Sequence, residues 1–213
     1  MSTWMLMALI AGNTPAMASD DVPTSWTLTP SPTALQVLVT YDRKALMKGH
    51  DHVLAPERFT GTVTWDVSDV STCAVNLSFP VTALRVDPAG TRKQHGFEGA
   101  TPDGDKAKIR ANAIGKQQLD ASSYPSIGFT STSCTPQGGG TLVRGHLTAH
   151  GVKVPVEAAM KVTVTQDTFR ATGRFQLSHA DLGMKPYTAV MGALRNAPQL
   201  TFHIDVSGTP TTR

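Results

Sequence analysis

Apolar and polar residues alternate along most of the chain beyond residue 34, and this pattern predicts β-strands. A period of two puts every second side chain on one face of a strand, so that this face can be buried while the other meets water. The segment 59–67 shows the pattern clearly, because Phe59, Val63 and Trp65 alternate there with threonines and an aspartate. The alternating pattern occurs in eight segments, which are residues 35–41, 59–67, 75–81, 127–131, 143–149, 154–164, 169–177 and 200–206.

We expect these segments to form one eight-stranded antiparallel barrel. Turn signals separate most of them, among them the glycines at 138–140 and the Gly151-Val152-Lys153 stretch. Closing the sheet on itself removes the exposed strand edges that would otherwise pair with other chains. No repeat, low-complexity tract or linker divides the chain, so the sequence predicts a single all-β domain.

Two connections are longer than turns. Residues 88–124, between the third and fourth strands, contain a helical stretch over about 105–119. Residues 185–199 join the seventh and eighth strands, and there Tyr187, Val190, Met191 and Leu194 have the spacing of one helix face. We expect a short helix over one barrel end with these four side chains facing inward, as a fixed plug or as a movable lid.

The inward-facing positions of the predicted strands carry no charged residue, and several are small. The small ones are Gly61, Ser131, Gly145, Ala149, Ala158, Ala171 and Gly173. An eight-stranded barrel is just wide enough either to be filled by its own side chains or to hold one small ligand. Small residues could leave room for a ligand or could accommodate bulky neighbours, and periodicity does not decide between these interpretations.

The composition excludes several classes of protein. The chain has 213 residues, of which 16% are charged, with 18 glycines and 14 prolines. These values do not suit a coiled coil, a helical bundle rich in Lys and Glu, or a charged disordered chain. The net charge is +3, but the basic residues are scattered rather than gathered in a stripe, so we expect no nucleic-acid binding.

The N-terminus resembles a secretory signal peptide. Residues 4–11 form a short apolar run, and Ala16-Met17-Ala18 fits a small-residue cleavage site, although no Lys or Arg precedes the run. The run is far shorter than the roughly 20 residues that cross a bilayer, so we expect no stable membrane insertion. Cleavage after Ala18 would leave residues 19–213 as the mature domain, in the periplasm or secreted. The alternative is a buried N-terminal strand.

The expected export bears on the redox state of the two cysteines. In an oxidising compartment, Cys73 and Cys134 are expected to form one disulfide, with two buried free thiols as the alternative. They lie at the start of the third strand and the end of the fourth, which meet if these strands pair antiparallel. Cys134, however, has the parity of outward-facing Thr130 and Thr132, so the prediction requires a bulge or a strand end there.

Three segments together resemble the YceI-like family of exported bacterial proteins. These are residues 123–133 (SYPSIGFTSTS), 145–156 (GHLTAHGVKVPV) and 177–184 (LSHADLGM), with the lead-in 119–124. Their order and spacing agree with the family over roughly residues 35–206. The chain departs from it at His179, where the family usually has Arg, in the histidine-rich run 48–54, and in a longer segment at 186–196.

The resemblance implies a lipocalin-like barrel whose apolar cavity holds an isoprenoid-type lipid, and it implies no catalytic residues. We therefore expect an apolar lipid ligand, no other cofactor, and a role as carrier or buffer, with a headgroup near the His50/His52 segment or the Tyr187 helix. The oligomeric state stays open between a monomer and a homodimer. The residues expected to line the cavity are Val63, Trp65, Phe79, Phe129, Leu147, Met160, Phe175, Phe202, Tyr187 and Met191.

Histidines supply the alternative function, a metal- or haem-associated redox accessory protein. His50 and His52 would share one face of a strand, as would His146 and His150, and imidazoles can bind zinc or copper. The second pair is expected on the outer face, and no further ligand is placed by the sequence. A structural role for His50, His52 and His150, as partners of buried backbone or carboxylate groups near a barrel end, is the simpler interpretation.

The sequence contains no motif that predicts an enzyme. No G-x-S-x-G elbow is present, and no nucleophile is placed beside Asp51, which lies between two histidines. Asp181 is expected to accept a backbone hydrogen bond in the turn before Gly183. We therefore expect no catalytic activity.

Overall fold

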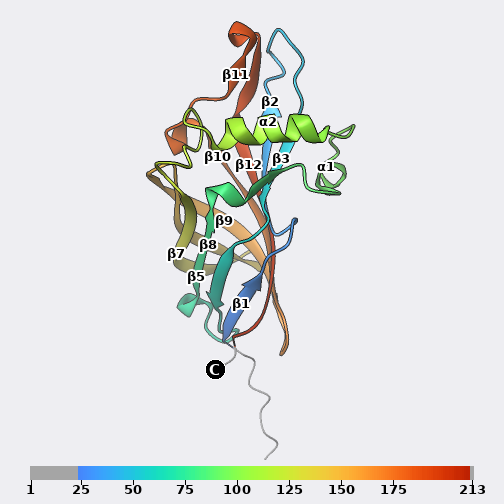
Figure 1. Cartoon of the computed structure of the whole chain (residues 1–213). Coiled ribbons are helices and arrows are strands. Elements are labelled where there is room, and N and C mark those ends of the chain that lie inside the picture. Colours follow the sequence, from blue (N-terminus) through green and yellow to red (C-terminus); the bar gives the residue numbers. More distant parts are fainter. Residues whose placement is uncertain (1–23, 212–213) are drawn as a thin grey trace, which may run out of the picture.

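Eight antiparallel strands close into a ring in the computed structural model, which describes residues 24–211. Around the ring, they are β1 (Ser25–Thr29), β4 (Thr60–Thr64), β5 (Ala74–Pro80), β7 (Ser126–Gln137), β8 (Gly140–Ala149), β9 (Val152–Val164), β10 (Phe169–Ser178) and β12 (Leu194–Pro210). β1 pairs with both β4 and β12 and so closes the barrel (Figure 1). The predicted antiparallel barrel is confirmed. The proposed signal peptide lies outside the described residues.

Three further strands extend one side of the barrel. These are β2 (Leu35–Tyr41), β3 (His52–Pro56) and β6 (Leu84–Val86). The first part of β12 pairs with β2, whereas its last part pairs with β1. β1 and β2 therefore lie one after the other along β12. The predicted strand 35–41 belongs to the upper half in Figure 1, and β1, which the sequence pattern missed, closes the lower half.

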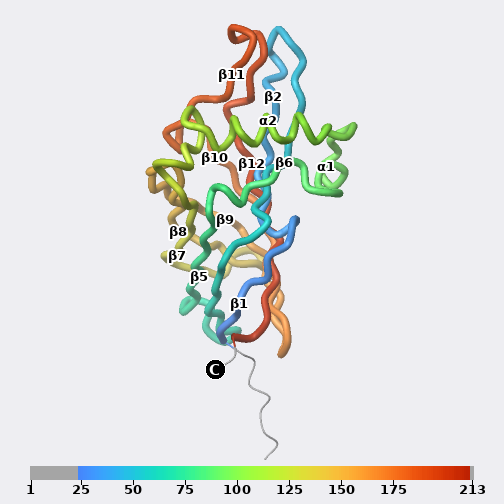
Figure 2. The backbone as a smooth tube through the Cα atoms, in the orientation of Figure 1, coloured from blue at the N-terminus to red at the C-terminus, as the bar shows by residue number. Residues whose placement is uncertain are grey.

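The predicted helical insertion is present. α1 (Thr91–Gln94) is a single short turn, and α2 (Asp103–Ile114) crosses the upper half of the barrel (Figures 1 and 2). Asp103 and Asp105 lie in the first turn of α2, where carboxylates are favoured by the helix dipole. α2 ends before Gly115, earlier than the sequence pattern suggests. Within residues 24–211, no helix has the length and apolar character needed to cross a membrane.

The segment 187–194 forms a hairpin rather than the expected amphipathic helix. β11 (Thr188–Ala189) pairs with the start of β12, and Val190–Gly192 make a single 3-10 turn between them. Val190 and Met191 are exposed at this turn instead of facing the barrel. The i, i+3, i+4, i+7 spacing is therefore coincidental, because backbone pairing with β12 and with the neighbouring loop determines the local structure.

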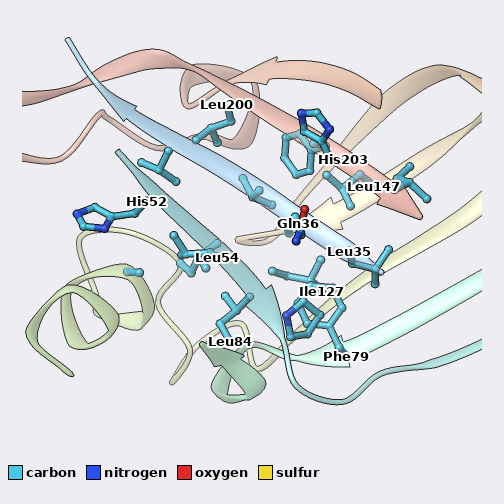
Figure 3. A pocket seen from close by; sticks show the side chains of 18 of the residues that line it. Leu35, Gln36, His52, Leu54, Phe79, Leu84, Ile127, Leu147, Leu200 and His203 are labelled. Atoms are coloured by element: carbon cyan, nitrogen blue, oxygen red, sulfur yellow. The ribbon is translucent and has the colours of Figure 1, made fainter. Parts of the chain in front are cut away.

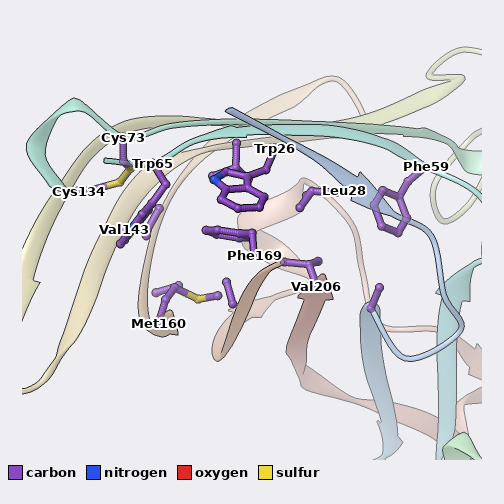
Figure 4. Packing of buried hydrophobic residues seen from close by; sticks show 14 residues of the cluster. Trp26, Leu28, Phe59, Trp65, Cys73, Cys134, Val143, Met160, Phe169 and Val206 are labelled. Carbon is purple, nitrogen blue, oxygen red and sulfur yellow. A yellow bond between two sulfur atoms is a disulfide. The ribbon is translucent and has the colours of Figure 1, made fainter. Parts of the chain in front are cut away.

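A cluster of aromatic and aliphatic side chains lies in the lower half of the barrel. Trp26 is fully buried, and its ring lies 6.1 Å from that of Phe169, which in turn lies 6.0 Å from that of Trp65 (Figure 4). These rings close the lower end. A second apolar cluster, which includes Leu54, Val81 and Leu200, lies in the upper half.

The Cys73–Cys134 disulfide is present and joins the start of β5 to the far part of β7 (Figure 4). The pairing of β7 with β8 shifts register between Ser131 and Ser133. This bulge reverses the parity of the strand, so that Cys134 is buried although Thr130 and Thr132 face outward. The bulge that the pairing requires is therefore found.

The inward glycines accommodate bulky neighbours. A Cβ on Gly145 would lie 2.5 Å from Cζ of Phe129, and one on Gly173 would lie 2.3 Å from Sδ of Met160. Gly61 is crowded in the same way by Leu28. At these three positions the packing interpretation is right, and the glycines do not create ligand space.

Candidate ligand cavity

An apolar cavity of about 650 Å³ occupies the barrel interior above the aromatic cluster. Inward-facing residues of the ring strands, such as Phe79, Ile127 and Leu147, form its wall together with residues of β2, β3 and β6 (Figure 3). Phe175 and Phe202 stack with ring centroids 4.6 Å apart and form one flat part of that wall. The volume lies within the range of small-molecule binding sites.

The structure brings most of the predicted lining residues together. Those that line the cavity are Val63, Trp65, Phe79, Phe129, Leu147, Met160, Phe175, Phe202 and Tyr187. Met191 does not, because its side chain is fully exposed at the hairpin turn. The prediction for Met191 fails because it depended on a helix that does not form.

Several lining residues were missed by the sequence pattern. Leu54 and Leu84 belong to the short strands β3 and β6, and Leu182 and Met184 follow β10 in a 3-10 turn and the loop after it. These positions carry no periodic signal, because β6 has only three residues, β3 is almost uniformly apolar, and Leu182 and Met184 lie outside the strands.

One face of α2 covers the cavity at its upper end. Asp105, Lys108, Ile109, Asn112 and Ala113 line the cavity, with the spacing of a single helix face. No residue of α2 is fully buried. The face of α2 over the cavity is thus apolar at Ile109 and Ala113, with polar side chains beside them.

Two sets of contacts fasten α2 to the barrel. Arg110 donates from Nε to the carbonyl of Leu84 at 2.8 Å. On the other side, Asn112 Nδ2 donates to the hydroxyl of Tyr187 at 3.2 Å. The second contact joins the helix directly to the β11–β12 hairpin, across the upper end of the cavity.

A buried carboxylate organises the wall beside α2. Asp87 accepts hydrogen bonds from the amide of Val53 at 2.8 Å and from the Thr101 hydroxyl at 2.6 Å. His52 Nδ1 also lies 2.8 Å from the carboxylate. Burial opposes ionisation of Asp87, but these hydrogen bonds outweigh it and hold the pKa of the carboxyl below its usual range. Asp87 has a positive φ of 48°, so it also makes the tight bend that follows β6.

Arg92 completes this network. Its Nη1 lies 3.4 Å from Asp87, and it also donates to the backbone carbonyls of Asp51, Glu98 and Gly99. The segment 87–101 is therefore anchored to β3 by charged hydrogen bonds. The same segment leads directly into α2.

The histidines lie in separate environments. His50 and His52 both line the cavity, with ring centroids 6.4 Å apart, but His52 binds Asp87 and His50 is exposed. His150 Nδ1 lies 3.1 Å from the carbonyl of Leu182. His146 faces away from the interior, as its parity predicts. Among residues 24–211, no group of three His, Cys, Asp or Glu side chains is placed to hold a metal ion.

A polar layer covers the outer face of β2. Gln36 is only 1% exposed, and its Oε1 accepts a hydrogen bond from His95 Nε2 at 2.7 Å. The ring of His95 lies 4.6 Å from that of His203. Burial lowers the pKa of both histidines, and His203 lowers that of His95 further, as Arg174 does for His203. This layer fixes α1 against the barrel wall.

The loop after β10 is held by side-chain contacts to the backbone. His179 is buried and lines the cavity, and its Nδ1 lies 2.9 Å from the carbonyl of Pro198. Burial lowers the pKa of His179, although the bond to Pro198 opposes this. Asp181 accepts from the amide of Ser178 at 2.7 Å, which lowers the pKa of Asp181 and stabilises the turn before Gly183.

Comparison with known structures agrees with the barrel. BcnA from Burkholderia cenocepacia is 16% identical and superposes with a TM-score of 0.60, covering 85% of this chain and 100% of its own. The YceI protein of Campylobacter jejuni is 10% identical, with a TM-score of 0.54, covering 78% of this chain and 88% of its own. At these identities the likeness concerns the fold alone.

The sequence comparisons identify the family. No curated protein matches the chain. The family model described as the YceI-like domain matches residues 26–206, which include every strand that surrounds the cavity except the ends of β1 and β12. The chain therefore belongs to the YceI-like domain family.

Proposed function

We propose that the protein binds one elongated apolar molecule, of the isoprenoid-lipid class, in the barrel cavity and acts as its carrier or buffer. The observation that carries this proposal is the cavity itself, of about 650 Å³, with a wall made mainly of aliphatic and aromatic side chains. In this role the protein needs no catalytic residue and no cofactor besides the lipid.

Apolar burial would supply most of the binding free energy. Each methylene group that leaves water contributes about 0.8 kcal/mol, before the ordering of the ligand is subtracted. The affinity should therefore rise with chain length until the cavity is filled. A flat wall such as the stacked Phe175–Phe202 pair suits the planar double bonds of an isoprenoid chain.

The upper end of the cavity suits a polar headgroup. Tyr41, His50 and Lys108 line it there, whereas the lower end is closed by tryptophan and phenylalanine. We infer that the chain enters tail first and that the headgroup remains beside α2.

An exported location fits this role. The apolar run 4–11 with its small-residue cleavage site, and the Cys73–Cys134 disulfide, both support passage into an oxidising compartment. We propose the periplasm or the bacterial exterior as that compartment.

Native mass spectrometry of the protein purified from its own host tests the proposal. A co-purified lipid is expected, with affinity that rises along a series of longer chains. Leu147→Trp places an indole in the cavity wall and should abolish binding, whereas Thr148→Trp, next to it on the exposed face of β8, should not. If Leu147→Trp fails to fold, Val37→Phe repeats the test on β2. A folded wild-type protein without lipid and without chain-length dependence would overturn the proposal.

A further inference from the structure

Two neighbouring loops at the upper end of the molecule expose large apolar side chains. Leu46 and Met47 lie between β2 and β3 and are 92% and 44% exposed. Val190 is 57% exposed and Met191 completely so, at the turn between β11 and β12. The loops are joined by a hydrogen bond of 2.8 Å from the Met47 amide to the Ala193 carbonyl, and both project beyond the barrel (Figure 1). We call these four exposed side chains the apolar tip.

The backbone of the hairpin turn is unfavourable for the residues that occupy it. Val190 and Met191 both have φ of 51°, in the left-handed region. Ala189 pairs with Leu194, and the Ala193 amide donates to the Val190 carbonyl, so Met191 and Gly192 are the two central residues of the turn. Turns with positive φ at both central positions favour Asn-Gly, so Met191 stands where Asn is preferred. Val190 is an outlier as well, because it is β-branched and has a positive φ. Neither side chain packs into the core, so folding does not explain why they stand at this turn. Such an outlier indicates a function for the exposed side chains.

Basic residues flank the apolar tip. The acidic side chains at this end are already paired, in Asp42–Arg195 at 2.7 Å and Arg43–Asp51 at 2.6 Å. Lys44 and Lys48 are exposed on either side of Leu46 and Met47. Neither lysine has a salt-bridge partner among residues 24–211. The loop therefore presents two uncompensated positive charges beside its apolar residues.

We propose that the apolar tip docks on the surface of an anionic lipid bilayer without spanning it. Apolar side chains that enter the headgroup boundary, together with lysines that attract acidic headgroups, are the combination used by interfacial segments. A stable protein interface needs about 800 Å² on each partner. Two narrow projecting loop ends suit a soft bilayer better than such a broad surface (Figure 2).

Docking would also orient the cavity. Tyr41, Gly49, Ala189 and Leu194 line the cavity and belong to the same two hairpins as the apolar tip. The upper end of the cavity would therefore face the bilayer, where a lipid could enter or leave. This consequence rests on the proposed lipid-binding function, whereas the docking itself does not.

Sedimentation with vesicles tests the docking. The full chain should bind vesicles of phosphatidylcholine mixed with phosphatidylglycerol, less so phosphatidylcholine alone, and salt should weaken the binding. Met191→Asp should reduce the partition coefficient at least tenfold, because it removes one exposed apolar side chain that enters the bilayer on docking. Lys44→Gln and Lys48→Gln should each reduce it about fivefold at low ionic strength.

Matched variants separate docking from general surface effects. Val67 is another exposed apolar side chain, 58% exposed, and Lys161 is an exposed lysine on β9. Val67→Asp and Lys161→Gln should leave vesicle binding unchanged. Equal losses in these variants and in the tip variants would overturn the proposal.

A turn replacement keeps the test independent of folding. The double variant Val190→Gly with Met191→Asn gives the turn its preferred Asn-Gly pair, with Gly192, and removes the β-branched residue with positive φ, so it should melt no lower than the wild type while it loses vesicle binding. Leu147→Trp, which fills the cavity, should still bind vesicles. Failure of the wild type to bind phosphatidylglycerol vesicles, or tip-dependent self-association in their absence, would overturn bilayer docking and leave the cavity proposal untouched.

Discussion

His52 and Asp87 join β3 to the segment that leads into α2, through a contact of 2.8 Å between Nδ1 and a carboxylate oxygen whose side chain is completely buried. The same carboxylate accepts from Thr101 and Val53 and lies close to Arg92. The segment that leads into α2, the helix over the cavity, is thus held to β3 by one buried carboxylate. The contact confirms for His52 the structural role, as partner of a buried carboxylate, that the sequence favoured over a metal site. The sequence did not identify Asp87 as that partner.

Asp87→Ala should lower the free energy of unfolding by about 3 kcal/mol, because it leaves Arg92 and the Val53 amide without their buried partner. Urea unfolding measures the loss, and hydrogen exchange should rise over residues 87–102. Arg144→Gln, which breaks the exposed pair with Glu157, is the control and should change little. An unchanged exchange rate in the segment would show that other contacts hold it.

The crowded glycines give a second prediction. Gly145→Ala puts a Cβ 2.5 Å from both Phe129 and the Thr130 carbonyl, and overpacking of this kind costs about 1–3 kcal/mol. Gly128→Ala is the matched control on the adjacent strand, since its nearest contact, to the Leu77 carbonyl, would be 3.5 Å. Thermal unfolding should separate the two variants. Equal melting temperatures would show that the Phe129 ring moves aside freely.

The sequence pattern predicts the ring strands other than β1, because each of them has one buried face and a length of at least five residues. β1 also has one buried face, but only Trp26 and Leu28 among its five residues are apolar, and the pattern missed it. β3 and β6 have five and three residues, and their pattern is too short or too uniformly apolar to alternate. The cavity wall was therefore predicted for the long strands and missed where Leu54 and Leu84 contribute to it. Local periodicity contains no information about which short segments pair.

The errors at the upper end have a different origin. The spacing of Tyr187, Val190, Met191 and Leu194 fits a helix, but long-range backbone hydrogen bonds, such as Met47 to Ala193, favour a hairpin. The burial of Gln36 has the same kind of cause. Its parity places it outward, and only the packing of α1 on that face buries it. Both depend on segments that are distant in sequence.

The disulfide should contribute strongly to stability. It closes a loop with a sequence separation of 61 residues, for which the chain-entropy model gives about 4 kcal/mol. The double variant Cys73→Ser with Cys134→Ser should lose up to that amount in urea unfolding, and a reductant should have the same effect on the wild type. Adding reductant to the double variant is the control and should change nothing. A wild type that titrates with two free thiols would contradict the prediction.

The polar layer on β2 predicts a dependence on pH. Burial lowers the pKa of His95 and His203 below the ordinary value of 6.5. As the pH falls below about 6.5, the unfolded chain takes up protons that the folded chain resists, so the free energy of unfolding should decrease. Above that pH this contribution to stability is fully present. His203→Gln should make the decrease shallower, whereas His146→Gln, outside the layer, should keep the contribution of both histidines. An equal slope in His203→Gln and wild type would exclude this layer as the cause.

The contact between Asn112 and Tyr187 predicts how a bound lipid would be released. α2 has no fully buried residue, and its hydrogen bond to the Tyr187 hydroxyl holds it to the β11–β12 hairpin across the cavity. Tyr187→Phe keeps the ring in the wall but removes this bond, which is worth about 0.5–1.5 kcal/mol, so lipid dissociation should accelerate about twofold to tenfold. Stopped-flow displacement of a fluorescent lipid measures the rate.

The partner variant shows whether that bond itself limits release. Asn112→Ala should accelerate dissociation by a similar factor, and the double variant should be no faster than either single one, because both remove the same interaction. Gln118→Ala, which removes a neighbouring hydrogen bond to the backbone carbonyl of Lys185, tests whether any loosening near α2 suffices. Additive effects of Asn112→Ala and Tyr187→Phe would mean that the two side chains act separately, and that α2 does not open by breaking their contact.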